Sequence, residues 1–228
     1  MKKIYSIWLY IKALLFIILF FPFIIIVAII MPKSIYTYAR FLSKGIFWCF
    51  NIQRNIIGTF PKKGNYILMH NHASFLDLFL LPTIINGKYT GIIAKKNFSI
   101  PLIGNILKKL HAIPINRSDI KSAKESIAIA EKFLKEGFHI AIFPEGTRTT
   151  TGQLNPFKKG GFHMAMNTNT PIIPIIVQGL YSIKPKTRWT IHPQPVNIII
   201  KKPIEIGNKN LDTLLSEIES IYLNYDLT

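Results

Sequence analysis

The stretch YILMHNHASFLDLFLL, from Tyr66 to Leu81, decides the fold of this chain. It holds two apolar runs separated by a short polar segment. The first run, Tyr66 to His70, predicts a buried strand, and the second predicts a helix from Ser74 to about Ile85. A strand that leads through a short loop into a helix is the building unit of α/β proteins with a parallel sheet.

Within this stretch, His72 and Asp77 stand five residues apart. On one continuous helix such residues point about 140° away from each other, so the chain must bend if the two side chains are to meet. Ser74 followed by Asp77 is a capping-box pattern, which places Ser74 at the N-cap and Asp77 in the first helical turn. Asp77 can then reach back to the loop that carries His72. A histidine held this way by a carboxylate is a simple general base near neutral pH. From the spacing alone, however, a helix cap beside a loop histidine is the better interpretation.

Beyond this stretch, strand and helix signals alternate along the chain. They predict an α/β fold with a largely parallel central sheet flanked by helices. Further strands are predicted at Thr90–Ala94, Ala112–Ile115, His139–Phe143, Pro171–Val177, Trp189–Ile191 and Val196–Lys201. Further helices are predicted at Ile100–Leu110 and at Leu211–Tyr222. Another is predicted to begin at a cap formed by Ser118 or Asp119 and to end at Gly137, with an apolar face that includes Ile120 and Leu134.

The N-terminal segment is apolar. From Ala13 to Met31 no side chain is charged or polar, which is long enough to cross the hydrocarbon of a bilayer. Pro22 lies at its midpoint, and a helix broken there would leave halves of about 13 Å, which enter one leaflet only. Basic residues flank both ends and assign no orientation: Lys2, Lys3, Lys12, Lys33, Arg40 and Lys44. The sequence thus leaves open a single span and a re-entrant helical pair, and it predicts a membrane anchor at residues 1–50 ahead of an α/β domain at residues 51–228.

The net charge of +17 on 228 residues indicates an anionic partner. Nucleic acid, an anionic membrane and phosphorylated substrates would all suit such a field. The sequence has no zinc-ligand spacing, helix-turn-helix signal or aromatic ribonucleoprotein motif, so we expect a membrane surface and no nucleic acid. Cys49 is the only cysteine, which excludes an intrachain disulfide.

Several blocks follow the His72 loop in a fixed order: Lys95 with Pro101-Leu102-Ile103-Gly104, Ile113-Pro114-Ile115-Asn116-Arg117, Phe143-Pro144-Glu145-Gly146-Thr147-Arg148 and Pro171-Ile172-Ile173-Pro174-Ile175. Together with the His-x4-Asp motif they resemble the glycerolipid acyltransferases, most closely the 1-acyl-sn-glycerol-3-phosphate acyltransferases, which make phosphatidic acid in phospholipid biosynthesis. The resemblance covers about Asn65 to Gly179. The chain differs from the family pattern at His111, where glycine is common, and at Asn116, where aspartate is more usual.

The resemblance implies a direct acyl transfer without an acyl-enzyme. His72 is expected to deprotonate the glycerol hydroxyl, and Asp77 to orient and charge-stabilise the histidine. Such a transfer needs a base for the hydroxyl, a group that holds the phosphate of the acceptor, and donors for the developing oxyanion. Residues 51–228 would then form the catalytic domain.

Candidates for binding the substrate come from the same blocks. Arg117 follows a predicted strand and is the strongest phosphate ligand, because a guanidinium binds phosphate bidentately. The other candidates are Lys95, Glu145, Gly146, Thr147 and Arg148. Glu145 is expected to accept a hydrogen bond from an acceptor hydroxyl, and Gly146 to let backbone N–H groups approach the ligand.

The donor would be acyl-CoA or an acyl-carrier protein, and we expect no other cofactor. His70 could join His72 and Asp77 in a metal site, but no third ligand is apparent, so no metal is expected. Location at a membrane with the catalytic domain on the cytoplasmic face would bring the enzyme to its acyl donors. Two alternatives stay open: an acyltransferase or transacylase for a different lysolipid or amino-lipid acceptor, and a non-catalytic membrane lipid-binding protein.

Overall fold

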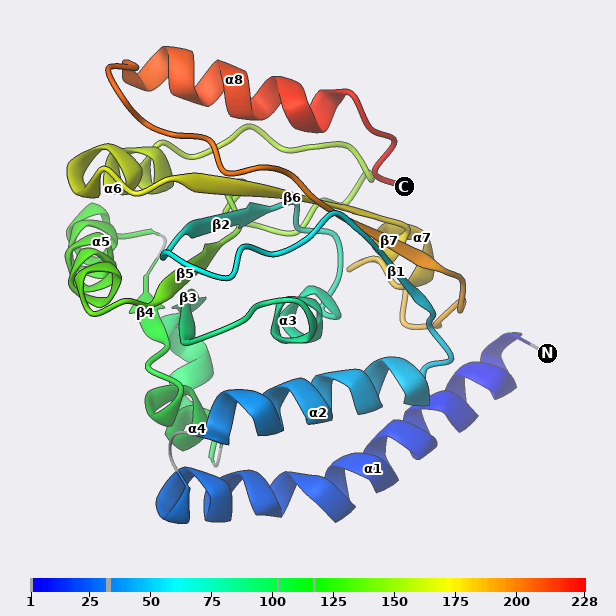
Figure 1. The fold of residues 1–228 in the computed structure, drawn as a ribbon. Helices are drawn as coiled ribbons and strands as arrows, with labels where there is room; N and C mark the ends of the chain where they lie inside the picture. Colours follow the sequence, from blue (N-terminus) through cyan, green and yellow to red (C-terminus); the bar gives the residue numbers. More distant parts are fainter. Residues whose placement is uncertain (1, 32–33, 102, 117) are drawn as a thin grey trace.

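The computed structural model describes residues 2–31, 34–101, 103–116 and 118–228. Arg117, the strongest predicted phosphate ligand, and Lys33, one of the basic flanking residues, lie outside the described residues. A seven-stranded sheet crosses the middle of the molecule, with helices on both of its faces (Figure 1). This architecture confirms the α/β fold class predicted from the strand-loop-helix pattern.

The strands are β1 (Arg54–Ile57), β2 (Ile67–His70), β3 (Tyr89–Ala94), β4 (Ile113–Ile115), β5 (His139–Ile142), β6 (Ile172–Gln178) and β7 (Val196–Ile200). Their order across the sheet is β1-β7-β6-β2-β5-β3-β4. Neighbouring strands run parallel except β6 and β7, which pair antiparallel. The largely parallel sheet is therefore confirmed, and the carboxyl ends of β2, β5, β3 and β4 meet along one edge.

The helices are α1 (Lys2–Ile30), α2 (Ile35–Cys49), α3 (Asp77–Leu80), α4 (Ile103–Lys109), α5 (Ile120–Lys135), α6 (Gly160–Thr168), α7 (Leu180–Ile183) and α8 (Leu211–Leu223), with short 3₁₀ turns η2 (Leu81–Thr83) and η3 (Lys95–Ser99). Asp119 caps α5 as predicted, since its side chain accepts a hydrogen bond from the Lys121 amide. Ile120 on the same helix is 78% exposed, so its predicted place on the apolar face is wrong.

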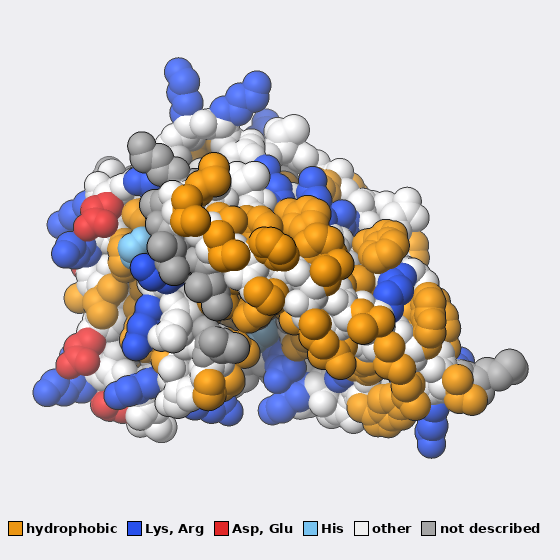
Figure 2. Space-filling view, turned by 90° about the horizontal axis from the view of Figure 1, so that it is seen from below, with side chains coloured by type: hydrophobic (Ala, Val, Ile, Leu, Met, Phe, Trp, Pro, Cys, Tyr) orange, Lys and Arg blue, Asp and Glu red, His pale blue; other side chains and the backbone are white. Residues whose placement is uncertain are grey.

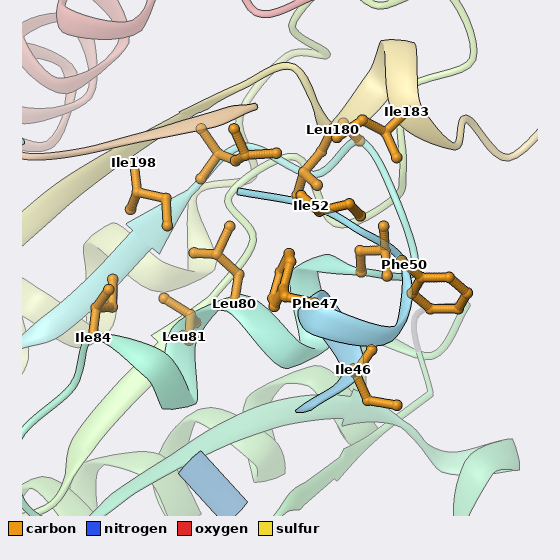
Figure 3. Close-up of a cluster of buried hydrophobic side chains, with 14 of the residues drawn as sticks. Ile46, Phe47, Phe50, Ile52, Leu80, Leu81, Ile84, Leu180, Ile183 and Ile198 are labelled. Atoms are coloured by element: carbon orange, nitrogen blue, oxygen red, sulfur yellow. The ribbon is translucent and has the colours of Figure 1, made fainter. Parts of the chain in front are cut away.

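Two hydrophobic layers sandwich the sheet. Leu68 of β2 faces the layer formed with α1, α2 and α3, whereas Ile67 and Met69 face the layer formed with α5, α6 and α8. Both faces of β2 are covered, which explains why it reads as a continuous apolar run without alternation. Figure 3 shows the first layer, where Phe47 at the end of α2 packs beside Leu80 of α3.

The N-terminal helices form an antiparallel pair beneath the α/β body (Figure 1). Pro22 lies inside α1 and does not break it, so the two half-helices considered from the sequence do not form. An interior proline costs about 3 kcal/mol or more in a helix, and here α2 packs across the affected turn. The Tyr38 hydroxyl donates to the Phe20 carbonyl at 2.6 Å, and the Phe20 ring lies 5.3 Å from that of Phe41.

Tertiary contacts explain three departures from the predicted elements. The segment predicted as a strand at Trp189–Ile191 is irregular, because the Ile191 amide and carbonyl bond to the Ser6 hydroxyl of α1. The edge strand β1 is mostly exposed and has no strong pattern, so the sequence did not predict it. Helix α6 was also missed: it begins at a glycine pair, and a Cβ at Gly161 would lie 2.2 Å from Ile142. Gly161 therefore lets α6 pack closely against Ile142 of β5.

His111, which replaces a common glycine of the family pattern, has a φ of 57°. This left-handed conformation suits glycine, which lacks the Cβ that crowds the backbone there. The residue ends the turn between α4 and β4, where its carbonyl accepts from the Thr90 hydroxyl at 2.6 Å. The backbone of this turn therefore supplies a physical reason for a glycine at this position.

Candidate functional site

The site lies beyond the carboxyl ends of β2 and β5. His72 follows β2 after one residue, and Glu145 follows β5 by three. Because β2 and β5 are parallel neighbours, the loops that leave them lie side by side. Ligands in open parallel sheets commonly bind beyond this edge.

His72 and Asp77 are in direct contact, as their spacing and the bend between them predicted. His72 Nδ1 lies 2.7 Å from Asp77 Oδ2, and the same oxygen accepts from the backbone amides of Ala73 and Ser74 at 2.9 Å each. The Asp77 side chain is fully buried, whereas that of His72 is 15% exposed. A carboxylate only accepts hydrogen bonds, so Nδ1 carries the proton and Nε2 of the neutral ring keeps its lone pair for another partner.

The helix cap differs from the predicted one. Helix α3 begins at Asp77, with Leu76 at the N-cap, and gives way to a 3₁₀ turn after Leu80. The Ser74 hydroxyl donates to the Lys184 carbonyl at 2.8 Å and accepts from the Leu76 amide at 3.4 Å, not from the Asp77 amide that the capping box predicts. The other bond of the capping box, from the Ser74 amide to Asp77, is present, and it draws the carboxylate toward His72.

The backbone of His72 is held at both ends. Its amide donates to Glu145 Oε1 at 2.6 Å, and its carbonyl accepts from the Thr149 amide at 2.8 Å. The other carboxylate oxygen of Glu145 accepts from the backbone and side-chain amides of Asn155 at 2.9 and 3.0 Å. Burial raises the pKa of Glu145, while these amide donors oppose the rise.

Glu145 is thus engaged within the protein. Both of its oxygens accept from His72 and Asn155, and its side chain is buried, so Glu145 helps to position His72. The bond to an acceptor hydroxyl that the sequence analysis expects stays a prediction. Thr149 and Asn155 were not predicted, because nothing in the local sequence links these loop residues to His72.

We predict that Glu145→Ala lowers kcat about 10- to 100-fold, because a displaced base loses its alignment with the acceptor. The KM for the acceptor should change little, since Glu145 does not face it. Steady-state kinetics on folded protein measures both constants, with Glu125→Gln, an exposed glutamate of α5, as the control. An unchanged kcat with a raised acceptor KM would instead return Glu145 to the substrate.

Two aromatic contacts complete the surroundings of the dyad. The Phe143 ring stacks on His72 with centroids 3.7 Å apart, and it meets His70 edge-on at 4.3 Å. His70 is fully buried in β2, and desolvation lowers its pKa to about 4, so its ring is neutral at physiological pH. No group of three side chains able to hold a metal occurs among the residues that the structure describes.

The predicted substrate-binding residues occupy different positions around this edge. Lys95 is exposed and directly follows β3, Thr147 is exposed, and Arg148 is half-buried. Gly146 has a φ of 73°, which favours glycine, and its amide donates to the Phe143 carbonyl at 2.9 Å. That amide closes a turn, and the prediction that Gly146 lets backbone N–H groups approach a ligand stays a prediction.

An apolar cavity reaches the dyad from below. It has a volume of about 580 Å³ and lies between the helical pair and the sheet. Asp77 and Phe143, which both contact His72, are among its lining residues. Helices α1, α2 and α4 contribute Phe16, Leu42 and Ile106. Sequence reasoning did not find this cavity, because its walls come from segments that no local pattern brings together.

Comparisons with known proteins agree with this geometry. The model of the family described as Acyltransferase matches residues 51–178. A 1-acyl-sn-glycerol-3-phosphate acyltransferase of Cocos nucifera is 32% identical over 190 residues, covering 82% of this chain and 61% of that protein. One from Limnanthes douglasii is 29% identical over 186 residues, covering 81% of this chain and 66% of its own length. The chain therefore spans less than two thirds of the length of these relatives.

A solved structure has the same fold. It is the 1-acyl-sn-glycerophosphate acyltransferase PlsC from Thermotoga maritima, which superposes with a TM-score of 0.83 at 24% sequence identity. The likeness covers 98% of this chain and 94% of that one, and so it includes the N-terminal helical pair. At this identity the likeness establishes the fold.

Proposed function

The chain belongs to the acyltransferase family, and from this premise we propose that it moves a fatty acyl group from an acyl thioester to the free hydroxyl of 1-acyl-glycerol 3-phosphate. The product is phosphatidic acid. The observation that carries the proposal is the contact between His72 and Asp77, a carboxylate that also lines an apolar cavity. A base and a place for an acyl chain meet there.

The reaction follows from the geometry of the dyad. His72 Nε2 takes the proton of the glycerol hydroxyl, and the oxygen attacks the thioester carbonyl. When the tetrahedral intermediate collapses, the carbon–sulfur bond breaks and the imidazolium returns the proton to the leaving thiolate. Asp77 stabilises the imidazolium through Nδ1 and holds the ring in one orientation, as a carboxylate does for other catalytic histidines.

A direct transfer agrees with the surroundings of His72. Ser74, the nearest hydroxyl along the chain, is buried and donates to the Lys184 carbonyl. Cys49 is buried, and desolvation raises the pKa of its thiol, which disfavours the nucleophilic thiolate. Neither side chain supplies a nucleophile for an acyl-enzyme.

The cavity supports a long-chain acyl donor. Its volume lies within the usual range for ligand sites, and its walls are formed almost entirely by apolar side chains. Each methylene buried there would contribute about 0.8 kcal/mol to binding. Acyl-CoA and acyl-carrier protein would both present such a chain through a thioester.

The test is an acceptor screen with purified protein. Lysophosphatidate, other lysolipids and amino-lipids are each supplied with acyl-CoA or acyl-carrier protein, and released thiol and lipid product are measured. We expect phosphatidic acid from lysophosphatidate. Transfer only to another lysolipid would favour the alternative acceptor, and no transfer to any of them would favour a lipid-binding protein.

The N-terminal helix α1 indicates membrane association, and we further propose that residues 1–50 anchor the catalytic domain from one face of the membrane. Residues 2–24 are long and apolar enough to span a bilayer. However, the Ser6 hydroxyl bonds to Ile191 and the Tyr10 hydroxyl donates to the Trp189 carbonyl, so the first turns of α1 are docked on the α/β body. A helix that crossed the bilayer from residue 2 would have to break these contacts.

The exposed face of the helical pair suits the interface of a membrane. Figure 2 shows hydrophobic side chains gathered over the underside of the molecule, with lysines and arginines around them. Trp8, Trp48 and Trp189 are the only tryptophans, and each is at least half exposed. Lys12 lies over the rings of Trp8 and Trp48, 5.0 and 4.4 Å from their centroids. Aromatic rings beside lysines are typical of the headgroup level of membrane proteins. We propose the cytoplasmic face, because it would bring the site to its acyl donors.

We predict that vesicles carrying brominated lipids quench the tryptophan fluorescence most strongly when the bromine is near the headgroup. The three tryptophans need no added label, and removing Trp8 and Trp48 by substitution with phenylalanine should abolish most of the effect. Strongest quenching by bromine near the chain ends would contradict the interfacial placement. So would protease protection of an N-terminal tag on the side of oriented vesicles opposite the catalytic domain.

A further inference from the structure

Helix α7 and the residues that follow it, Leu180 to Thr190, touch both loops that surround His72. The Lys184 carbonyl accepts from the Ser74 hydroxyl at 2.8 Å, two residues from His72 in the chain. The Tyr181 hydroxyl donates to the Thr150 carbonyl at 2.9 Å, two residues beyond Arg148. The segment lies outside the sequence blocks of the family resemblance, and tertiary bonds alone bring it to the site.

Three cations come from this segment and the loop after β5, and the charges of Arg148 and Arg188 both act on Lys184. Lys184 is half-buried, and its Nζ lies 3.0 Å from the Pro185 carbonyl and 5.9 Å from the centre of the Phe75 ring. Arg188 donates to the carbonyls of Ser182, Ile183 and Thr190, so its guanidinium holds the segment in place. Arg148 comes from the loop after β5.

These cations lack a protein counter-ion. Desolvation lowers the pKa of Lys184, and the charges of Arg148 and Arg188 lower it further. Within the described part of the chain, ion pairs form elsewhere and involve none of the three cations. Partly buried cations that repel one another and meet no carboxylate form a site that an anion would stabilise.

We propose that Lys184 is a further ligand of the acceptor phosphate, beside Arg148, which the family resemblance already makes a candidate. This inference rests on the proposed function. In 1-acyl-glycerol 3-phosphate the phosphate and the reacting hydroxyl are carried by adjacent carbons, so the phosphate must lie near His72. Lys184 meets that condition because its carbonyl accepts from Ser74 and its Nζ lies 5.9 Å from the centre of the Phe75 ring, and both partners belong to the His72 loop. The phosphates of CoA are separated from the thioester by a long pantetheine arm, so they have no need of a cation beside the base.

The test is Lys184→Gln, with kinetic constants measured separately for lysophosphatidate and for the acyl donor. We expect the KM for lysophosphatidate to rise roughly 10- to 100-fold, the value of a hydrogen bond to a charged group, and the donor KM to stay unchanged. Lys184→Arg should restore most of the binding. Lys186→Gln, an exposed lysine two residues on, is the matched control and should behave as the wild type.

An acceptor without phosphate separates binding from folding. Monoacylglycerol should be a poor acceptor for the wild type. Lys184→Gln should lower the ratio of kcat/KM for lysophosphatidate to kcat/KM for monoacylglycerol roughly 10- to 100-fold, whereas Lys186→Gln should leave this ratio unchanged. An equal loss on both acceptors would overturn the inference, because it would show damage to the fold. A raised donor KM with an unchanged lysophosphatidate KM would overturn it too, since the phosphate held by Lys184 would then be that of the donor.

The proposed function fails in a different way. A wild-type protein inactive on lysophosphatidate would overturn the function, and this inference with it. An active wild type whose lysophosphatidate KM is not moved by Lys184→Gln would overturn this inference alone.

Discussion

Substitution of His72 by glutamine is expected to lower the rate of acyl transfer by roughly 10²- to 10⁴-fold, the usual contribution of a positioned base. Glutamine can preserve some of the polar contacts of the ring, but it cannot take a proton from the glycerol hydroxyl. Its KM values for both substrates should stay near those of the wild type. Single-turnover measurement of thiol release would isolate the chemical step.

The control for this variant is His163→Gln, which changes an exposed histidine of α6. It should retain full activity, and both proteins should melt at similar temperatures. A His72→Gln enzyme with nearly normal kcat would contradict general-base catalysis by this residue. The function would then have to rest on another base or on a non-catalytic role.

Asp77→Asn should also cause a large loss, about 10²-fold or more in kcat. One oxygen of Asp77 accepts from His72 Nδ1 and from two backbone amides. An asparagine oxygen could keep the amide bonds, but the uncharged group no longer stabilises the imidazolium, and its N–H₂ can favour the opposite tautomer of the ring. A comparable change in a Ser-His-Asp triad lowers kcat by about 10⁴-fold.

A matched substitution exists at the cap of α5. Asp119 accepts from the Lys121 amide, and asparagine is as good an N-cap as aspartate, so Asp119→Asn should change neither stability nor activity. Comparing the two variants shows whether activity depends on the negative charge beside His72 in particular, because Asp119→Asn removes a carboxylate at another helix start. Normal turnover by folded Asp77→Asn would contradict the dyad.

Local patterns predicted most of the elements that carry the site. The apolar run before His72 became β2, and the run before Phe143 became β5. Both strands are buried on two faces, so their composition identifies them without reference to neighbours. Elements whose character depends on their partners were missed, such as the exposed edge strand β1 and the glycine-led helix α6.

The role of individual polar residues was harder to predict than their proximity. The motif placed Glu145 near the dyad. A carboxylate there can bind a substrate or hold a backbone amide, and the sequence around Glu145 does not distinguish these two roles. Only the tertiary structure shows its bonds to His72 and Asn155. Ser74 is similar, since its hydroxyl accepts from the nearby Leu76 amide but also donates to the distant Lys184 carbonyl.

The sequence by itself determined the α/β fold, the apolar N-terminal segment and the pairing of His72 with Asp77. These features depend on periodicity, composition and a bend within a few residues, all of which are local. Only the tertiary structure decided the clamp of Glu145 on His72, the cavity between the helical pair and the sheet, and the approach of Lys184 to the site. The bond between His72 and Glu145 joins residues 73 positions apart, and the bond between Ser74 and Lys184 joins residues 110 positions apart. Such contacts depend on how the layers of the fold pack, which no local pattern specifies.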